Sequence, residues 1–532
     1  MKDFSNKFFE KINLKELLFL ITLFIVCIGF CCLNCYPDND LWARLIAGEH
    51  IVERLSVLKN DFLSYTQTHL WYDHEWGASI FFYLALKLFG HSGLIFLKGI
   101  LTALTLFVCY KTVKLNNPKS TVSYNILYFA IMFFAVFQNL GPTTRCLLFT
   151  CLFFALYLYL LEKARLGNTK SLIWLPIIML FWSNIHGGCL SGLGLIGIYC
   201  VGEFLNKKPI KNYIITAFIS VLTMFINPYG LEYVKFIFFA GTMDRTFITE
   251  WTSPFHKYYL ADYLRYKFYL VFIVLTQIIY LIKNKINYEK ADKTKILIIL
   301  VMIYLSVTHL RHIPFFILTA GTLLYDEFYS IFNSFINYLR NKFKLTNEET
   351  IKTIVLAKEV IVYLLLIFMA LPPLLEKNKQ IRITETKYPR YAIEFIKINN
   401  LTGNLFINFD WGSYAAYKLF PYNKIVMDGR YEEVYNPELL IDLKNFHMVK
   451  DNWYKVIQDY KTDILVIEKK YPVYNKILQH KDWKLVFENN LSGVFVPTSS
   501  EKEQYLMPIA DNDYYNKTLF NKYFSFNIHS PL

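Results

Sequence analysis

The segment Cys35-Tyr-Pro-Asp-Asn-Asp-Leu-Trp-Ala-Arg44 follows directly on an apolar run that covers about residues 14–36. It carries two carboxylates, Asp38 and Asp40, where a hydrophobic helix is expected to leave a bilayer. Four apolar residues after it are spaced as in an amphipathic helix on a membrane surface: Leu41, Leu45, Ile46 and Ile51. Acidic groups are costly to desolvate at such a boundary, so their presence predicts a functional site. The alternative is an Asp that is simply solvated past a helix end.

Composition indicates a membrane protein. The chain has 532 residues, of which 55% are hydrophobic and only 18% charged, and apolar runs near the length of a bilayer crossing recur along it. The net charge of +14 could suggest a nucleic-acid partner, but the Lys and Arg residues fall in short clusters between the apolar runs. We therefore predict a polytopic membrane protein that does not bind nucleic acid.

The nine cysteines lie within or beside predicted membrane helices. Cys32 and Cys35 have CxxC spacing, but at the end of a membrane helix this spacing indicates helix packing rather than a metal site. Lys2, Lys7 and Lys11 precede the first apolar run, which is too long for the core of a cleaved signal peptide and lacks a small-x-small site. We expect a retained signal anchor.

Basic connectors predict the sidedness of about eleven membrane helices. The expected helices cover about residues 14–36, 92–110, 121–138, 146–162, 171–184, 189–205, 212–226, 267–283, 296–308, 314–333 and 354–373. Residues 75–89 are too short for a span and predict an interfacial or re-entrant helix. Lys-rich connectors alternate with connectors that carry His, Asp, Glu and aromatic residues, which predicts a cytoplasmic N-terminus.

From about residue 380 onward the pattern changes to short apolar strands and polar helices. Segments 405–409, 424–427, 463–467 and 483–487 are typical of strands, and helical segments lie between them. This alternation predicts a soluble α/β domain with a largely parallel sheet. We expect a mainly α transmembrane domain over residues 1–378 and an extracytoplasmic α/β domain over residues 379–532.

Short motifs recur from the first loop to the C-terminal region: Pro37-Asp-Asn-Asp-Leu-Trp42, Asp61-Phe-Leu-Ser-Tyr65, His74-Glu-Trp76, Asn184-Ile-His-Gly-Gly188, Asn227-Pro-Tyr-Gly230, Arg311-His-Ile-Pro314 and Asp428-Gly-Arg430. Together they resemble a bacterial membrane-protein family that is usually grouped with the GT-C glycosyltransferases, such as protein O-mannosyltransferases and aminoarabinose transferases. The resemblance implies transfer of a sugar from a polyprenyl-phosphate carrier to an envelope glycan, lipid or protein. It also implies the bacterial inner (plasma) membrane as the location.

The resemblance also assigns candidate catalytic residues. An acidic residue in the first external loop is essential in GT-C enzymes, and Asp40 or Asp38 matches it by position. Displacing a lipid phosphate requires a base for the acceptor hydroxyl and positive charge for the departing phosphate. We predict that Asp40 or Asp38 is the base and that the phosphate ligands are Arg145, His186, Arg311, His312 and, by snorkelling, Lys98. His186 could instead hydrogen-bond backbone at a glycine turn.

Further polar residues are weaker candidates. His74, Glu75 and Glu250 are possible accessory residues, although each also suits a capping or anchoring role. A divalent metal held by Asp38, Asp40 and His74 is a further alternative, although the spacing of these residues matches no defined metal site. In the C-terminal domain a ligand crevice is expected where four residues gather at strand ends: Asp410, Trp411, Asp428 and Arg430. An Asp–Arg pair that ties loops together is an equal alternative.

Two other functional classes fit parts of the pattern. A lipid-linked glycan transporter or flippase would carry charged residues within several membrane helices, whereas apart from Lys98 the predicted helices are nearly free of them. A non-catalytic scaffold would use its external domain to bind a partner. The sequence favours the transferase over both.

Overall fold

The computed structural model describes residues 14–33, 35–118, 120–140, 143–243, 245, 248–285, 291–343, 347–376 and 379–500. The predicted N-terminal flank of Lys2, Lys7 and Lys11 lies outside these residues. The chain forms two compact units. We call Met1–Cys35 with Ile95–Gln380 the helical unit, and Tyr36–Leu94 with Ile381–Leu532 the sheet unit.

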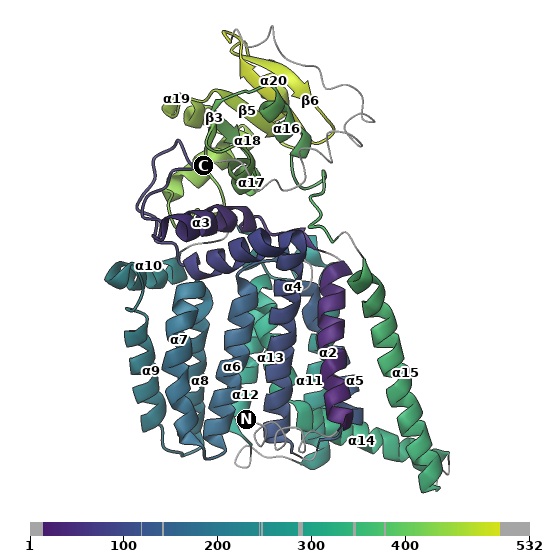
Figure 1. The fold of residues 1–532 in the computed structure, drawn as a ribbon. Helices are drawn as coiled ribbons and strands as arrows, with labels where there is room; N and C mark the ends of the chain where they lie inside the picture. Colours follow the sequence, from purple (N-terminus) through teal and green to yellow (C-terminus); the bar gives the residue numbers. More distant parts are fainter. Residues whose placement is uncertain are drawn as a thin grey trace. The chain divides into compact units, whose positions relative to one another are not determined.

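The helical unit consists of helices joined by short connections, and Figure 1 shows most of them running side by side. Its helices are α2 (Leu14–Leu33), the C-terminal part of α4 (Trp76–Asn116), α5 (Val122–Leu140), α6 (Leu147–Arg165), α7 (Trp174–Ile185), α8 (Leu190–Leu205), α9 (Lys211–Thr223), α10 (Gly230–Thr242), α11 (Leu264–Asn284), α12 (Lys293–Thr308), α13 (Ile313–Leu323), α14 (Tyr325–Lys342) and α15 (Glu348–Leu375). Five 3-10 turns connect them: η1 (Thr169–Ile173), η2 (Gly187–Cys189), η3 (Thr249–Trp251), η4 (Lys257–Tyr259) and η5 (Leu310–His312). The short strand β2 (Thr143–Thr144) precedes α6.

Six of the described helices are long and apolar enough to cross a membrane: Leu14–Leu33, Trp76–Asn116, Leu147–Arg165, Gly187–Leu205, Leu264–Asn284 and Lys352–Leu375. Large apolar side chains on two of them, Phe268, Leu364 and Phe368, are not covered by protein. Apolar surface of this extent is stable in contact with lipid rather than water. The chain is thus an integral membrane protein.

Close helix contacts order the helical unit. α2 packs along α15, and a Cβ atom at Gly29 would overlap the backbone carbonyl of Ala370. Small residues permit such close approach where lipid gives no hydrophobic driving force between helices. α13 packs against α5, α6 and α12, and all of its 11 residues are buried.

The structure differs from the expected helix over residues 314–333. That stretch forms two helices, with the buried α13 ending at Leu323 and α14 beginning at Tyr325. The break follows the change in composition, because Asp326 and Glu327 open a helix whose polar and apolar residues lie on different faces. α10 is a second helix that the sequence did not predict, within the connector expected over residues 227–266.

The sheet unit contains a five-stranded sheet with the strand order β4-β3-β5-β7-β6. Its elements are β1 (Tyr36–Pro37), α3 (Leu41–Arg54), the N-terminal part of α4, α16 (Arg390–Ile398), β3 (Gly403–Ile407), α17 (Phe409–Leu419), β4 (Asn423–Ile425), α18 (Pro437–Met448), α19 (Lys455–Asp459), β5 (Ile464–Glu468), α20 (Val473–Leu478), β6 (Trp483–Glu488) and β7 (Ser492–Pro497). β3 pairs in parallel with β4 and β5, whereas β7 pairs antiparallel with β5 and β6. The sheet is therefore mixed rather than largely parallel.

The first loop is built into the sheet unit. Ser64 forms a parallel bridge with Ile425 of β4, and the flanking hydrogen bonds run from Tyr65 N–H to the Ile425 carbonyl (3.1 Å) and from Ile425 N–H to the Leu63 carbonyl (2.9 Å). The loop thereby covers the exposed edge of β4, which would otherwise present unpaired backbone groups. Trp71 adds to the same core and is fully buried there.

These contacts bear on two expectations. The domain boundary near residue 378 stays a prediction, but the structure adds that Tyr36–Leu94 clusters with the C-terminal residues. Gly90 interrupts α4 with φ 60° and ψ −152°, a conformation that glycine adopts readily. The interruption lies between the expected interfacial helix over 75–89 and the expected span from about residue 92.

Candidate functional site

Titratable side chains gather in each unit, and those of the helical unit come from three connectors. We call this group the cationic cluster: Arg145, Arg245, Glu250, Trp251, His309, Arg311 and His312. Arg145 follows β2, while Glu250 and Trp251 lie in η3 and Arg311 and His312 in η5. The Leu310 N–H donates to the Thr252 carbonyl at 3.0 Å, which ties η3 to η5.

Glu250 is the carboxylate of the cationic cluster. Its Oε1 lies 2.5 Å from Nη1 of Arg145. Burial alone would raise the pKa of Glu250, but Arg145, Arg311 and His186 together lower it to about 2. Glu250 is therefore ionised at neutral pH and compensates one guanidinium.

Trp251 carries two more guanidinium groups. The central carbon atoms of Arg245 and Arg311 each lie 4.8 Å from the centre of its ring, within the range of a cation–π interaction. Arg311 is half-buried, and it forms no hydrogen bond or ion pair with any residue that the structure describes. Its five N–H donors are thus available to a ligand, and a guanidinium suits a phosphate.

His312 lies beside Arg311 and packs edge-on to Trp251, with ring centres 5.7 Å apart. Burial and the neighbouring Arg311 lower the pKa of His312 to about 4. The ring is therefore neutral at neutral pH, so His312 can stabilise a phosphate by hydrogen bonding or packing but not by charge.

His186 is held by a short hydrogen-bond chain. Its Nδ1 accepts the Gly188 N–H at 3.0 Å and lies 2.7 Å from Oγ1 of Thr150. That hydroxyl accepts the Trp182 indole N–H at 2.8 Å, and it donates its own proton to Nδ1, because an Nδ1 that accepts the Gly188 N–H carries no proton. A neutral His186 consequently carries its proton on Nε2. The glycine-turn contact is the alternative that the sequence suggested, and the effect of His186 on Glu250 places it close to the cationic cluster.

The structure thus brings four of the five predicted phosphate ligands together within the helical unit: Arg145, His186, Arg311 and His312. Lys98 is fully buried in α4, and its role as a phosphate ligand stays a prediction. Glu250, predicted as an accessory residue, joins the four through Arg145.

The sheet unit contains the predicted catalytic carboxylates. Asp40 occupies the N-cap position of α3, but its side chain makes no capping hydrogen bond. Its backbone N–H donates to Oδ1 of Asp38 at 3.3 Å. A Cβ atom at Gly429 would overlap Oδ1 of Asp40, so this carboxylate lies directly against the backbone of the Asp428-Gly-Arg430 motif.

Asp410 belongs to the same group. Oδ1 of Asp410 accepts the Asn39 amide at 3.3 Å, and the Asn39 Oδ1 accepts the Tyr388 hydroxyl at 2.9 Å. Burial raises the pKa of Asp410. Burial also raises the pKa of Tyr388, and the surrounding carboxylates of Asp38, Asp40 and Asp410 raise it further. We call these three carboxylates the acidic cluster.

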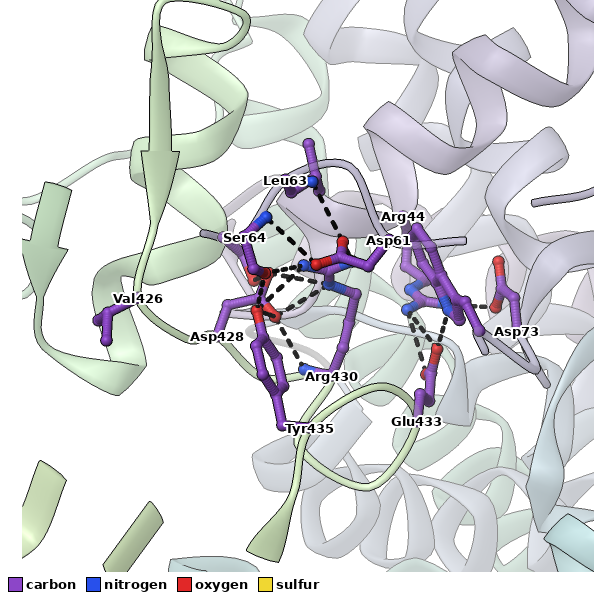
Figure 2. Close-up of polar contacts among 12 residues, drawn as sticks. Arg44, Asp61, Leu63, Ser64, Asp73, Val426, Asp428, Arg430, Glu433 and Tyr435 are labelled. Carbon is purple, nitrogen blue, oxygen red and sulfur yellow. Dashed lines mark hydrogen bonds and ion pairs between the residues drawn. The ribbon is translucent and has the colours of Figure 1, made fainter. Parts of the chain in front are cut away.

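The remaining residues of the predicted crevice are buried. Trp411 is 3% exposed and its indole N–H donates to the Lys387 carbonyl at 2.7 Å. Arg430 contacts Asp61 (Nη1 to Oδ1, 2.6 Å) and Asp428 (Nε to Oδ1, 2.9 Å), as Figure 2 shows. The pKa of Asp61 would rise on burial, but Arg430 lowers it. These contacts favour the alternative in which an Asp–Arg pair ties loops together.

Arg44 forms a second buried centre in the sheet unit (Figure 2). It pairs with Asp73, with Glu75 (3.3 Å) and with Glu433 (3.2 Å). Glu433 also accepts the Trp71 indole N–H and lies 3.3 Å from Nδ1 of His74. Burial raises the pKa of Glu433; the pKa of His74 is raised as well, because Glu433 and Glu75 outweigh the opposing effect of its burial.

His74, Glu75 and Glu433 are a possible metal-ligand set, since one atom from each lies within 4.8 Å of the others. Arg44 already pairs with both glutamates, so a guanidinium supplies the positive charge that a cation would bring. The donor set therefore fits an ion-pair centre better than a metal site. A metal held by Asp38, Asp40 and His74 stays a prediction.

The sequence placed Asp73 beside His74 and Glu75, but it did not identify Arg44, Tyr388, Arg245 and Glu433 as members of these groups. Arg44 and Glu433 are 389 positions apart, and no periodicity connects residues at that separation. Asp61 was visible as part of a motif, but nothing in the sequence indicated its pairing with Arg430.

No protein-family model matches the chain, and no curated protein matches it. Among solved structures, the apo oligosaccharyltransferase of Archaeoglobus fulgidus is similar, with a TM-score of 0.54 and 11% identity over 85% of this chain and 69% of that chain. The same coverage holds for that enzyme tethered to an acceptor peptide (TM-score 0.53, 11% identity) and for its complex, as AglB, with an inhibitory peptide and a dolichol-phosphate (0.54, 9%). At such identities the similarity shows the fold, and the expected GT-C-like fold is confirmed.

Proposed function

We propose that this protein is a membrane glycosyltransferase that moves a sugar from a polyprenyl-phosphate carrier to an envelope acceptor on the non-cytoplasmic face. The GT-C-like fold supports the class, and the AglB complex is an example of that fold with a dolichol-phosphate bound. The observation that carries the proposal is Arg311, a half-buried guanidinium fixed over Trp251 whose donors are not used by any described residue.

In this proposal the cationic cluster binds the phosphate of the donor lipid. When the bond between the anomeric carbon and the phosphate oxygen breaks, the phosphate gains one negative charge. Arg311 donates two parallel N–H groups to that oxygen-rich group, which stabilises the charge as it develops. Glu250 orients Arg145 through their ion pair, and the neutral His312 packs beside the phosphate without competing for its charge.

The acidic cluster supplies the base. Asp40 is our first choice and Asp38 the second, because the carboxylate of Asp40 lies against Gly429 of the Asp428-Gly-Arg430 motif. Its carboxylate takes the proton of the acceptor hydroxyl as that oxygen attacks the anomeric carbon. Asp410, whose pKa is raised by burial, accepts the proton from the catalytic carboxylate in the same cluster.

The membrane arrangement is part of the proposal. We propose eleven crossings of the bacterial inner membrane with the N-terminus in the cytoplasm. Residues 1–378 then form the transmembrane domain and residues 379–532 an extracytoplasmic α/β domain. The alternation of basic and titratable connectors along the sequence supports this sidedness.

A deletion strain tests the function. Sugar analysis of its envelope should show one glycan component missing, and the wild-type gene should restore it. The Asp40→Asn variant should be inserted at the wild-type level and restore at most about 1% of the component, since a general base contributes about 10²–10⁴-fold. Asp451→Asn, which removes an exposed carboxylate of the same unit, should restore it fully.

Two results would contradict the proposal. An unchanged envelope in the deletion strain would exclude the transferase and favour a scaffold. Full restoration by both Asp40→Asn and Asp38→Asn would show that neither aspartate is the base. The proposed glycosyltransferase class would then be tested by the Arg311→Ala variant.

A further inference from the structure

A cavity of about 470 Å³ opens between the C-terminal end of α6 and the beginning of α7 in the helical unit. It lies far along α6 from Arg145, at the end of the helix that leads into a lysine-bearing connector. One end of the cavity is polar and the other apolar, and no residue of the cationic or acidic cluster lines it.

The polar end carries two ammonium groups. Lys163 and Lys170 line it together with the exposed Asn168, and neither lysine forms a hydrogen bond or ion pair through its side chain with a described residue. Lys163 only lies over the Tyr159 ring, 5.8 Å from its centre. The polar end therefore presents two positive charges that an anionic group can approach.

Glu162, which precedes Lys163 in the sequence, is already paired within the fold. Glu162 accepts hydrogen bonds from Arg165 (3.1 Å), Tyr199 (2.8 Å) and Asn116 (3.0 Å). It is 5% exposed and belongs to a buried network that continues from Arg165 to Glu203 and Asp292. Among the described residues that line the cavity there is no carboxylate.

The apolar end adjoins an outer surface of exposed hydrophobic side chains. Leu156, Leu160 and Ile178 line the cavity, and Trp174 forms its rim with 57% of its surface exposed. Beyond the rim, Ile173 and Phe181 are also mostly exposed. In a membrane protein such surface lies against acyl chains, and a tryptophan marks the level of the head groups.

We propose that this cavity binds an anionic phospholipid. Its phosphate lies between Lys163 and Lys170, the Asn168 amide donates to a phosphate oxygen, and one acyl chain runs past Trp174 toward Leu156 and Ile178. Basic pockets between membrane helices have the charge and the position that suit such head groups. A free phosphate shares the head-group chemistry, but it would leave the apolar wall unfilled. The inference does not depend on the proposed transferase.

Native mass spectrometry of the detergent-purified full-length protein tests the site. Phosphatidylglycerol should bind more tightly than phosphatidylcholine. The double variant Lys163→Gln/Lys170→Gln should weaken phosphatidylglycerol binding by about thirtyfold, since each lysine near an anionic head group contributes about a factor of five. The matched control, Lys207→Gln/Lys211→Gln, removes two exposed lysines of a neighbouring connector that do not line the cavity and should leave binding unchanged.

A second variant separates the lipid from a free anion. Ile178→Trp fills the apolar end and keeps both lysines, so it should reduce phosphatidylglycerol binding. The unfolding temperature should be the same as that of the wild type. Equal losses in the two lysine pairs would overturn the proposal, because binding would then follow surface charge alone. Full competition by inorganic phosphate, or unchanged lipid binding in Ile178→Trp, would assign the lysines to a free anion instead.

Discussion

Arg430 and Arg311 each lie over a tryptophan ring, and their surroundings differ. Arg430 of the sheet unit lies 4.5 Å from the centre of the Trp71 ring, and Arg311 of the helical unit lies 4.8 Å from that of Trp251. Arg430 is 1% exposed and its donors reach two carboxylates and the Tyr435 hydroxyl. Arg311 is half-buried and has no such partner among the residues that the structure describes.

The comparison separates a structural arginine from a ligand-binding one. A buried guanidinium must have its donors satisfied, and Arg430 satisfies them within the fold. A half-buried guanidinium held in place by an aromatic ring keeps its orientation while its donors stay accessible. Aromatic stacking is therefore common to both, and the number of nearby carboxylates decides which role each arginine has.

The largest expected effect is on Arg430. Arg430→Leu should destabilise the full-length protein by about 3–5 kcal/mol, because it leaves Asp61 and Asp428 buried without a counter-charge. Thermal unfolding in detergent at pH 7.5 measures the loss. Lowering the pH toward 4 should recover part of it, since the two carboxyl groups then become neutral.

Arg54→Leu is the matched control, because Arg54 is an exposed residue at the end of α3 and its loss should change stability by about 0.5 kcal/mol or less. If Arg430→Leu unfolds at the same temperature as this control, Arg430 does not stabilise the fold, and the assignment of Arg430 as a structural arginine is wrong.

Arg311 should show the opposite response. Arg311→Ala should lower kcat/KM for sugar transfer by about 10²–10³-fold, because a preorganised donor to the departing phosphate is lost. Free polyprenyl phosphate should also inhibit the variant less strongly than it inhibits the wild type. The unfolding temperature should stay close to that of the wild type, since the fold does not use these donors.

Arg265→Ala provides the matched control for Arg311. Arg265 also stacks on an aromatic ring, 4.5 Å from the centre of Phe134, and it is exposed. Its loss should leave transfer unchanged. A comparable loss of transfer in both variants, or a loss of stability without a loss of transfer in Arg311→Ala, would place Arg311 among the structural arginines.

Local patterns in the sequence predicted most of the helices. Expected helices at 189–205 and 296–308 correspond closely to α8 and α12, because an apolar run with a basic connector on one side marks the extent of a helix by itself. The end of α13 at Leu323 was missed, because the predicted helix was continued to residue 333, past the change in composition at Asp326 and Glu327. The four predicted strands lie close to β3, β4, β5 and β6, but β7 was not predicted, and its antiparallel pairing with β5 depends on contacts between distant segments.

The clusters were harder to predict than the helices. Charged and imidazole residues in the connectors identified Arg145, Glu250 and Arg311 as candidates, and the structure brings them together in the helical unit. The pairing of Arg44 with Glu433 could not be predicted, because it depends on the fold of a loop and a domain more than 300 residues apart. Residue type thus predicts which side chains are reactive, whereas their partners follow only from the tertiary structure.

Arg44 extends the comparison to a third case, in which one arginine faces an excess of carboxylates. Burial raises the pKa of Glu433 above its ordinary 4.5, and Glu433 and Glu75 raise the pKa of His74 above 6.5. A group whose folded pKa is raised contributes stability that is complete below its unfolded pKa and is lost as the pH rises through the folded value. Both groups therefore have the same sign, and the protein should become less stable as the pH rises from about 4.5 through neutral.

Glu433→Gln isolates this smallest effect. The substitution removes the carboxyl group that gains a proton in the folded state and keeps an acceptor for the Trp71 indole N–H. The unfolding temperature of the wild type should fall by a few degrees between pH 5 and pH 8, and the fall should be shallower in Glu433→Gln. Glu438→Gln, at an exposed position near the start of α18, should keep the wild-type slope. If the unfolding temperature falls equally with pH in all three proteins, Arg44 neutralises its carboxylates completely. Its role would then be the same as that of Arg430, whose charge is fully compensated.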